Sequence, residues 1–76
     1  MAFRVPEWTD EDLERWSELE AQAIEALEVG NFREAKRCIA EMRTIAEKVG
    51  DENALEPLAM RVIAGFGGEV FDELFS

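Results

Sequence analysis

Apolar residues recur along this chain at helical spacing, and β-branched residues never occur in an alternating run. The clearest pattern lies between residues 32 and 49, where apolar positions are separated by three and four residues in turn. Such a stripe covers one face of an α-helix, so the segment is predicted to be an amphipathic helix that Gly50 ends. The stripe consists of Phe32, Ala35, Ile39, Met42, Ala46 and Val49, and it is widened by Cys38 and Ile45.

Another helix is predicted at residues 9–29. Thr9 has the hydroxyl of an N-cap, and the three acidic residues after it suit the positive end of the helix dipole. Trp8 and Leu13 flank this start at the spacing of a hydrophobic staple. Gly30 ends the helix, because glycine is common just beyond a helix C-terminus. The apolar face of this helix consists of Leu13, Trp16, Leu19, Ala23, Ile24 and Leu27.

Two shorter helices are predicted at residues 53–65 and 69–75. Asn53 and Glu56 have the spacing of a capping box, and Pro57 lies near the start, where a missing N–H costs least. Glycines at positions 65, 67 and 68 separate the two helices. The sequence therefore predicts an all-α fold of three to four antiparallel helices, in a single domain spanning 1–76 with an N-terminal segment at 1–8.

The composition limits what can stabilise so short a chain. Its 76 residues include one cysteine, Cys38, and no histidine, so the sequence offers neither an internal disulfide nor a cysteine–histidine zinc site. No metal and no other cofactor is expected. A domain of this length buries a small share of its surface and commonly needs very good packing or a partner subunit. We therefore expect a homodimer.

The charge is strongly acidic, with a net value of −10 from 18 acidic and 8 basic residues. Phosphate backbones repel such a surface, so no direct binding to nucleic acid is expected. No apolar run reaches the roughly 20 residues of a membrane span and no signal peptide is recognisable, so a cytoplasmic protein without membrane contact is expected. Residues 7–28 hold nine acids and one base, whereas residues 33–48 hold three acids and five bases, which favours contact between these two helices.

Two segments carry a further pattern. Between the first two helices the chain reads Gly-x-aromatic-x-Glu-Ala, and the second helix ends as Ile-Ala-x-x-x-Gly-Asp. In both segments the chain resembles the tetratricopeptide repeat family, as a degenerate module of about one and a half repeats. The resemblance implies a helical hairpin that binds proteins or peptides without catalysis. The matching residues are Gly30, Phe32, Glu34, Ala35, Ile45, Ala46, Gly50 and Asp51, whereas Gln22, Ala26 and Met42 depart from the family pattern.

The residue types do not assemble into a catalytic site. Without histidine, tyrosine or a second cysteine, catalysis would rest on carboxylates, lysine and hydroxyl groups, and the acidic residues fall on exposed faces of the predicted helices. The protein is therefore not expected to be an enzyme. The leading interpretation is a protein–protein interaction module, a small regulator or adaptor that binds another protein and associates with itself.

Candidate partner-binding residues are large apolar side chains near the helix ends, together with acidic side chains that steer a partner. Trp8 is either a binding anchor or part of the staple at the start of the first helix. Residues 70–75 either fold back as the last core helix or dock as an amphipathic helix into a groove of another protein. The predicted set consists of Trp8, Phe66, Val70, Phe71, Leu74, Phe75, Glu14, Glu18 and Glu25.

An alternative function is acidic inhibition. A chain with a net charge of −10 can present carboxylates where a nucleic-acid-binding protein expects phosphates, as small phage-encoded nucleic-acid mimics do. Salt separates the two functions, because exposed charges are screened beyond a Debye length of about 8 Å at physiological ionic strength. Binding by mimicry weakens steeply as salt rises, whereas binding through apolar anchors responds little. A third interpretation is a structural subunit of an assembly.

Overall fold

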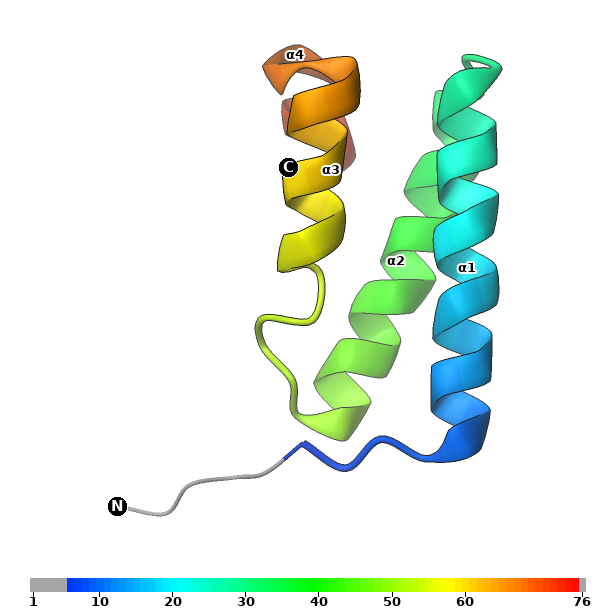
Figure 1. Ribbon diagram of the computed structural model, residues 1–76, viewed down its shortest axis with the longest axis vertical. Coiled ribbons are helices and arrows are strands. Elements are labelled where there is room, and N and C mark those ends of the chain that lie inside the picture. Colours follow the sequence, from blue (N-terminus) through cyan, green and yellow to red (C-terminus); the bar gives the residue numbers. More distant parts are fainter. Residues whose placement is uncertain (1–5, 76) are drawn as a thin grey trace.

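The computed structural model describes residues 6–75, which form four α-helices (Figure 1). Successive helices run in opposite directions, so the predicted all-α fold of antiparallel helices is confirmed. Residues 1–5 of the predicted N-terminal segment lie outside the described residues. The helices are α1 (Asp10–Glu28), α2 (Phe32–Val49), α3 (Glu56–Phe66) and α4 (Gly68–Phe75).

The start of α1 is capped as its sequence predicts. The Thr9 hydroxyl accepts a hydrogen bond from the backbone N–H of Asp12 at 3.1 Å. The aromatic ring beside Trp8 is that of Trp16, at a centroid distance of 5.2 Å and in an edge-to-face arrangement. Leu13, the expected partner of Trp8 in the staple and a member of the predicted apolar face, is 48% exposed. Contact between the two tryptophan rings therefore joins the segment before α1 to that helix.

The turn between α1 and α2 has the hydrogen bonds of a Schellman motif. The N–H of Asn31 donates to the carbonyl of Ala26 at 2.7 Å, and the N–H of Gly30 donates to the carbonyl of Leu27 at 3.1 Å. These bonds require Gly30 to adopt a left-handed conformation, with φ of 76°. Residues with a Cβ are strained in that conformation, so glycine at this position determines where α1 ends.

Two glycine substitutions are expected to change stability in opposite directions. Gly30→Ala should lower the free energy of unfolding by about 1 kcal/mol, because the left-handed φ penalises a Cβ although no atom lies within 4 Å of it. The control Gly65→Ala lies inside α3, also in open space, and should raise the free energy of unfolding by about 0.5–1 kcal/mol. Urea unfolding followed by circular dichroism measures both, and a shift of the same sign in the two variants would contradict this account.

Helix α3 begins at Glu56, three residues later than predicted, and the predicted capping box at Asn53 is wrong. No side chain caps this helix. Asn53 lies instead in a turn, where its N–H donates to Asp51 Oδ1 at 3.3 Å and its carbonyl accepts from the N–H of Glu56 at 3.1 Å. Because these turns already satisfy the local backbone groups, helical bonding starts only with the N–H of Ala59 donating to the carbonyl of Leu55.

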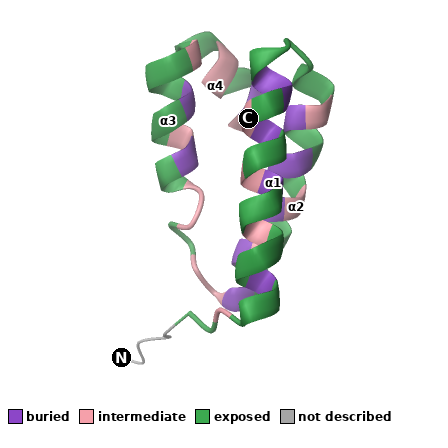
Figure 2. Cartoon of the chain, turned by 45° about the vertical axis from the view of Figure 1, so that its right-hand side comes forward, coloured by how far each residue is buried: buried purple, intermediate pink, exposed green. Residues whose placement is uncertain are grey.

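The core is built on the hairpin of α1 and α2, which have the most extensive helix–helix contact in the molecule. Two ion pairs cross this contact: Lys48 with Asp12 at 3.0 Å, and Arg15 with Glu41 at 2.7 Å. Of the predicted α2 stripe, only Phe32 is exposed. Figure 2 shows the buried positions along the inner sides of the helices. The core cluster consists of Leu19, Ala23, Ala26, Leu27, Ala35, Cys38, Ile39, Met42, Leu58, Val62 and Leu74.

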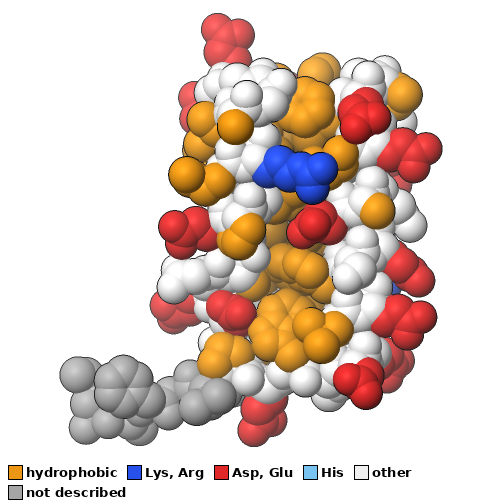
Figure 3. Space-filling model, in the orientation of Figure 1, with side chains coloured by type: hydrophobic (Ala, Val, Ile, Leu, Met, Phe, Trp, Pro, Cys, Tyr) orange, Lys and Arg blue, Asp and Glu red, His pale blue; other side chains and the backbone are white. Residues whose placement is uncertain are grey.

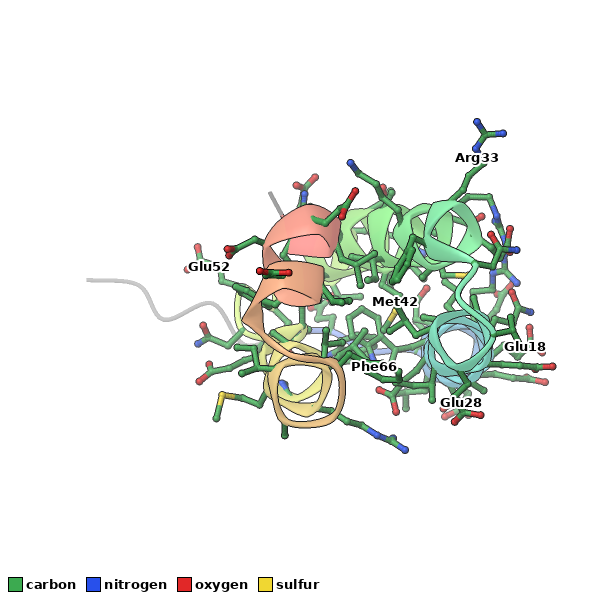
Figure 4. All side chains as sticks on the ribbon, turned by 90° about the horizontal axis from the view of Figure 1, so that it is seen from above. Glu18, Glu28, Arg33, Met42, Glu52 and Phe66 are labelled. Atoms are coloured by element: carbon green, nitrogen blue, oxygen red, sulfur yellow. The ribbon has the colours of Figure 1, made fainter. Side chains whose placement is uncertain are left out.

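The second hairpin, of α3 and α4, joins the first mainly through α4, which packs on α2. Figure 4 shows the result from above: α3 and α1 lie on the same side of the molecule, with α4 and α2 behind them. The radius of gyration is 12.8 Å, compared with about 11 Å for a compact domain of this length. The four helices therefore form an open arrangement. Across residues 6–75, none of them combines the length and apolar character that crossing a bilayer requires.

Candidate partner-binding surface

Helix α3 has apolar surface that the rest of the molecule leaves open. Only Glu56 and Arg61 are charged among its 11 residues. Its close backbone packing is with α4, and only two of its side chains, at positions 58 and 62, are buried. Met60 and Ile63 are 63% and 44% exposed. A helix that is apolar around most of its circumference is normally covered on most sides. The exposed side of α3 is therefore the candidate partner-binding surface.

A furrow separates α3 from α1, and we call it the α1–α3 furrow. In Figure 3 a band of apolar side chains runs along it, a basic and an acidic side chain lie across the band in its upper half, and further acidic side chains stand on both flanks. Within the furrow lies a hollow of about 490 Å³, which Ile24 of α1 and Arg61 of α3 line from opposite sides. The other lining residues belong to α1 and are Ser17, Glu20, Ala21, Glu25 and Glu28.

Half-buried apolar side chains from both helices border the furrow. Figure 4 shows Phe66 in the space between α3 and α1, and this side chain packs against the core cluster. Ile24 is half-buried in the same way. Trp16 is also half-buried and lies two turns before Ile24 on the same side of α1. Of the aromatic residues predicted to bind a partner, Phe66 is therefore the one the structure places at the furrow.

Trp8 holds a structural position at the base of the molecule. Its indole N–H donates to Asp51 Oδ2 at 3.1 Å, across 43 positions of sequence. Its ring contacts Trp16, and the neighbouring N–H of Glu7 donates to the carbonyl of Val49 at 3.1 Å. Trp8 therefore joins the segment before α1 to the end of α2 and the loop after it.

The predicted anchors in the C-terminal segment lie on α4, which folds back onto α2 and α3. Leu74 is 2% exposed and belongs to the core cluster, so it is not available to a partner in this conformation. Phe71 and Phe75 stack on each other at a centroid distance of 5.0 Å. These two rings and Val70 are half-buried against the core cluster. Residues 70–75 therefore belong to the last core helix, which is one of the two interpretations of this segment.

The three predicted acidic residues lie along one stripe of α1, because they are spaced four and seven residues apart on that helix. Glu14 and Glu18 line a hollow together with Ile45 and Lys48 of α2. Glu18 also pairs with Arg15 at 3.4 Å, and both side chains are exposed. Glu25 lines the α1–α3 furrow. Glu25 is therefore the member of the acidic set that lines the hollow in the furrow, and Glu14 and Glu18 continue its stripe toward the start of α1.

Several residues at the candidate surface are absent from the predicted set. A signal for them exists in the sequence, because the segment that forms α3 has only two charged residues among 11 positions. No local pattern indicates which residues of α1 face α3, since that depends on how the second hairpin packs on the first. The residues in question are Glu20, Ile24, Glu28, Met60, Arg61 and Ile63.

Basic side chains near α1 are neutralised by ion pairs on the side away from the furrow. Arg15 and Arg37 both contact Glu41, at 2.7 and 2.6 Å, and Arg37 also binds Glu34. Lys48 donates to the carboxylate of Asp12, and this bond, with a second from Thr9, holds the pKa of Asp12 below its usual range. The acids at the furrow have no such partners. Among residues 6–75, no ion pair or hydrogen bond engages the side chains of Glu20, Glu25, Glu28 and Arg61.

The chain matches no protein-family model, no curated protein and no solved structure. Helices α1 and α2 form a hairpin around Gly30, but hairpins of this kind occur in many all-α proteins. The resemblance to the tetratricopeptide family therefore stays a prediction. The surface chemistry of the molecule is the basis for a functional proposal.

Proposed function

We propose that the protein is a non-catalytic protein-interaction module of the cytoplasm, acting as a small regulator or adaptor whose partner covers α3. One observation carries the proposal: α3 is apolar around most of its circumference, yet Met60 and Ile63 on it are 63% and 44% exposed. Exposed apolar surface of this kind is typical of protein–protein contacts. A degenerate tetratricopeptide-like hairpin agrees with this function without being required for it.

One partner in this proposal is a second copy of the chain, bound through the outer side of α3. Met60 and Ile63 are exposed there, and α3 as a whole has one acid and one base. Two copies with a net charge of −10 each repel one another over most of their surface. They approach at the lowest cost along a face that lacks charge. Helix α3 provides that face, so it is the proposed centre of a homodimer.

The alternative of acidic inhibition is less well supported by the arrangement of charges. A mimic of nucleic acid needs a continuous row of free carboxylates. On the outer side of the α1–α2 hairpin, the carboxylates of Asp12, Glu18, Glu34 and Glu41 are instead paired with Lys48, Arg15 and Arg37. The free carboxylates of Glu20, Glu25 and Glu28 lie at the furrow, beside the apolar surface of α3. An apolar contact through α3 therefore remains the leading proposal.

Self-association through α3 is expected to depend on its exposed apolar side chains. The double variant Met60→Glu, Ile63→Glu should be monomeric at tens to hundreds of micromolar, where the wild-type chain is dimeric in sedimentation velocity. The control Val29→Glu adds charge at a residue that is 76% exposed at the end of α1, and it should remain dimeric. Circular dichroism should show the same helix content in all three proteins, because every substituted side chain is exposed.

Two results would count against the proposal. A wild-type chain that stays monomeric throughout this range would exclude the homodimer. Retention of the same host proteins by the immobilised wild-type chain and by the double variant would exclude α3 as the partner-binding helix.

A further inference from the structure

We propose that the α1–α3 furrow binds an amphipathic helix of another protein, with one apolar side and with lysine or arginine along the flank that faces α1. The inference rests on the proposed function and specifies an occupant for one side of α3.

The size of the furrow suits a short helix. Its length is set by α3, whose 11 residues extend about 16 Å at a rise of about 1.5 Å per residue. Three turns of a partner helix match that length. The half-buried side chains of Ile24 and Phe66 border the furrow with apolar surface. A helix that inserts there needs apolar residues at positions i, i+3 or i+4, and i+7.

The charge of the furrow selects a basic partner. Glu20, Glu25 and Glu28 line the α1 side, and none of them is neutralised by a base within residues 6–75. Arg61 alone supplies positive charge to the lining, from the α3 side. A partner helix with bases on the flank toward α1 and an acid opposite Arg61 complements this arrangement. Complementary charge of this kind speeds association and selects among partners.

A second copy of the chain does not fit this furrow. The basic helix of the molecule is α2, where Arg33, Lys36 and Arg43 are exposed. Apart from Phe32, its apolar stripe is covered by its own chain, so α2 has no continuous apolar side to insert into a neighbour. Helix α1 is strongly acidic, and its carboxylates would meet those of the furrow. The occupant is therefore a helix from another protein.

Synthetic peptides that contain only leucine and one type of charged residue test this proposal, because they differ only in charge and in the spacing of leucine. The first has leucines at amphipathic helical spacing and lysine elsewhere, the second replaces lysine by glutamate, and the third has the leucine–lysine composition in scrambled order. The emission of Trp16 and Trp8 reports binding, because the peptides lack tryptophan. The amphipathic leucine–lysine peptide should bind at least tenfold more tightly than the scrambled peptide, and the leucine–glutamate peptide should not bind.

Charge reversal locates the peptide on the protein. The variant Glu25→Lys, Glu28→Lys changes two exposed furrow residues and should weaken binding of the amphipathic leucine–lysine peptide tenfold or more. The control Glu69→Lys, Asp72→Lys has the same spacing and the same change in charge on exposed positions of α4. It should weaken binding less than threefold, and circular dichroism should show unchanged helix content in both variants.

Four results would overturn the inference. The first three are the absence of binding, equal affinity for the amphipathic and scrambled leucine–lysine peptides, and equal weakening in the two charge-reversal variants. The fourth is a loss of dimerisation in the variant Glu25→Lys, Glu28→Lys. The last result would assign the furrow to a second copy. If the peptides fail while dimerisation still depends on Met60 and Ile63, only the basic helix is excluded and the proposed function stands. If both fail, the proposed function is excluded as well.

Discussion

The variant Leu74→Asp is expected to release α3 and α4 together from the rest of the molecule. Leu74 is 2% exposed and lies on α4, the helix that connects α3 to α2. An aspartate there is buried without a partner, which should cost about 3–5 kcal/mol. A domain of this length has a total stability of about 4–11 kcal/mol, so the loss is a large share of it. Helix α3 should detach with α4, because its close packing is with that helix.

Hydrogen exchange measured residue by residue distinguishes this outcome from general destabilisation. Amides of residues 56–75 should lose protection first, whereas the inner amides of α1 and α2 keep the higher protection. The control Asp72→Ser changes an exposed residue of the same helix and should cost no more than about 0.5 kcal/mol. Equal loss of protection in all four helices would show that the two hairpins form one cooperative unit.

The variant Leu19→Ala is expected to destabilise the whole fold. Leu19 is fully buried in the core cluster, on the helix that makes the most extensive contact of the molecule. Removing three carbon atoms there loses hydrophobic burial and leaves a cavity, at a cost of about 2–5 kcal/mol. Urea unfolding followed by far-UV circular dichroism should show this as a lower midpoint with an unchanged slope.

An exposed leucine on the same helix provides the control for Leu19→Ala. Leu13 is 48% exposed, so Leu13→Ala should cost less than about 1 kcal/mol. Equal losses in the two variants would mean that the contact between α1 and α2 is not the centre of the core.

Local patterns in the sequence predict the helices well where every local signal agrees. The α2 stripe repeats at three and four residues, Asn31 accepts from the N–H of Glu34 at its start, and the left-handed Gly50 ends it. The predicted range and the observed range of this helix are the same. For α3 the signals disagree, because Asn53 has the spacing of a cap but its backbone is already used in a turn. Sequence spacing alone does not show that competition.

The charge pattern predicts contact between α1 and α2 but not the individual ion pairs. Asp12 and Lys48 pair as expected, with the acid on α1 and the base on α2. Arg15 and Glu41 pair in the opposite sense, with the base on the acidic helix. The net charge of a segment therefore predicts which segments approach, whereas side-chain register decides the pairs.

The candidate surface was the least predictable part of the molecule. Large aromatic residues suggested anchors, yet Trp8 is held by Asp51 and the rings of α4 pack against the core cluster. The α1–α3 furrow exists because the backbone of α4, rather than that of α3, comes close to the first hairpin, which α3 reaches through the side chains of Leu58 and Val62. That choice depends on contacts between residues far apart in the chain, which no pattern within a single helix reports.

The order of the helices matters during synthesis on the ribosome. A nascent chain that has released α1 and α2 can already close their hairpin, because a short turn joins them. Helix α3 emerges from the ribosome next and remains without its main neighbour until α4 has emerged as well. During that interval the apolar side chains of α3 are accessible to chaperones. A transcript truncated before α4 would yield a polypeptide suited to degradation rather than to assembly.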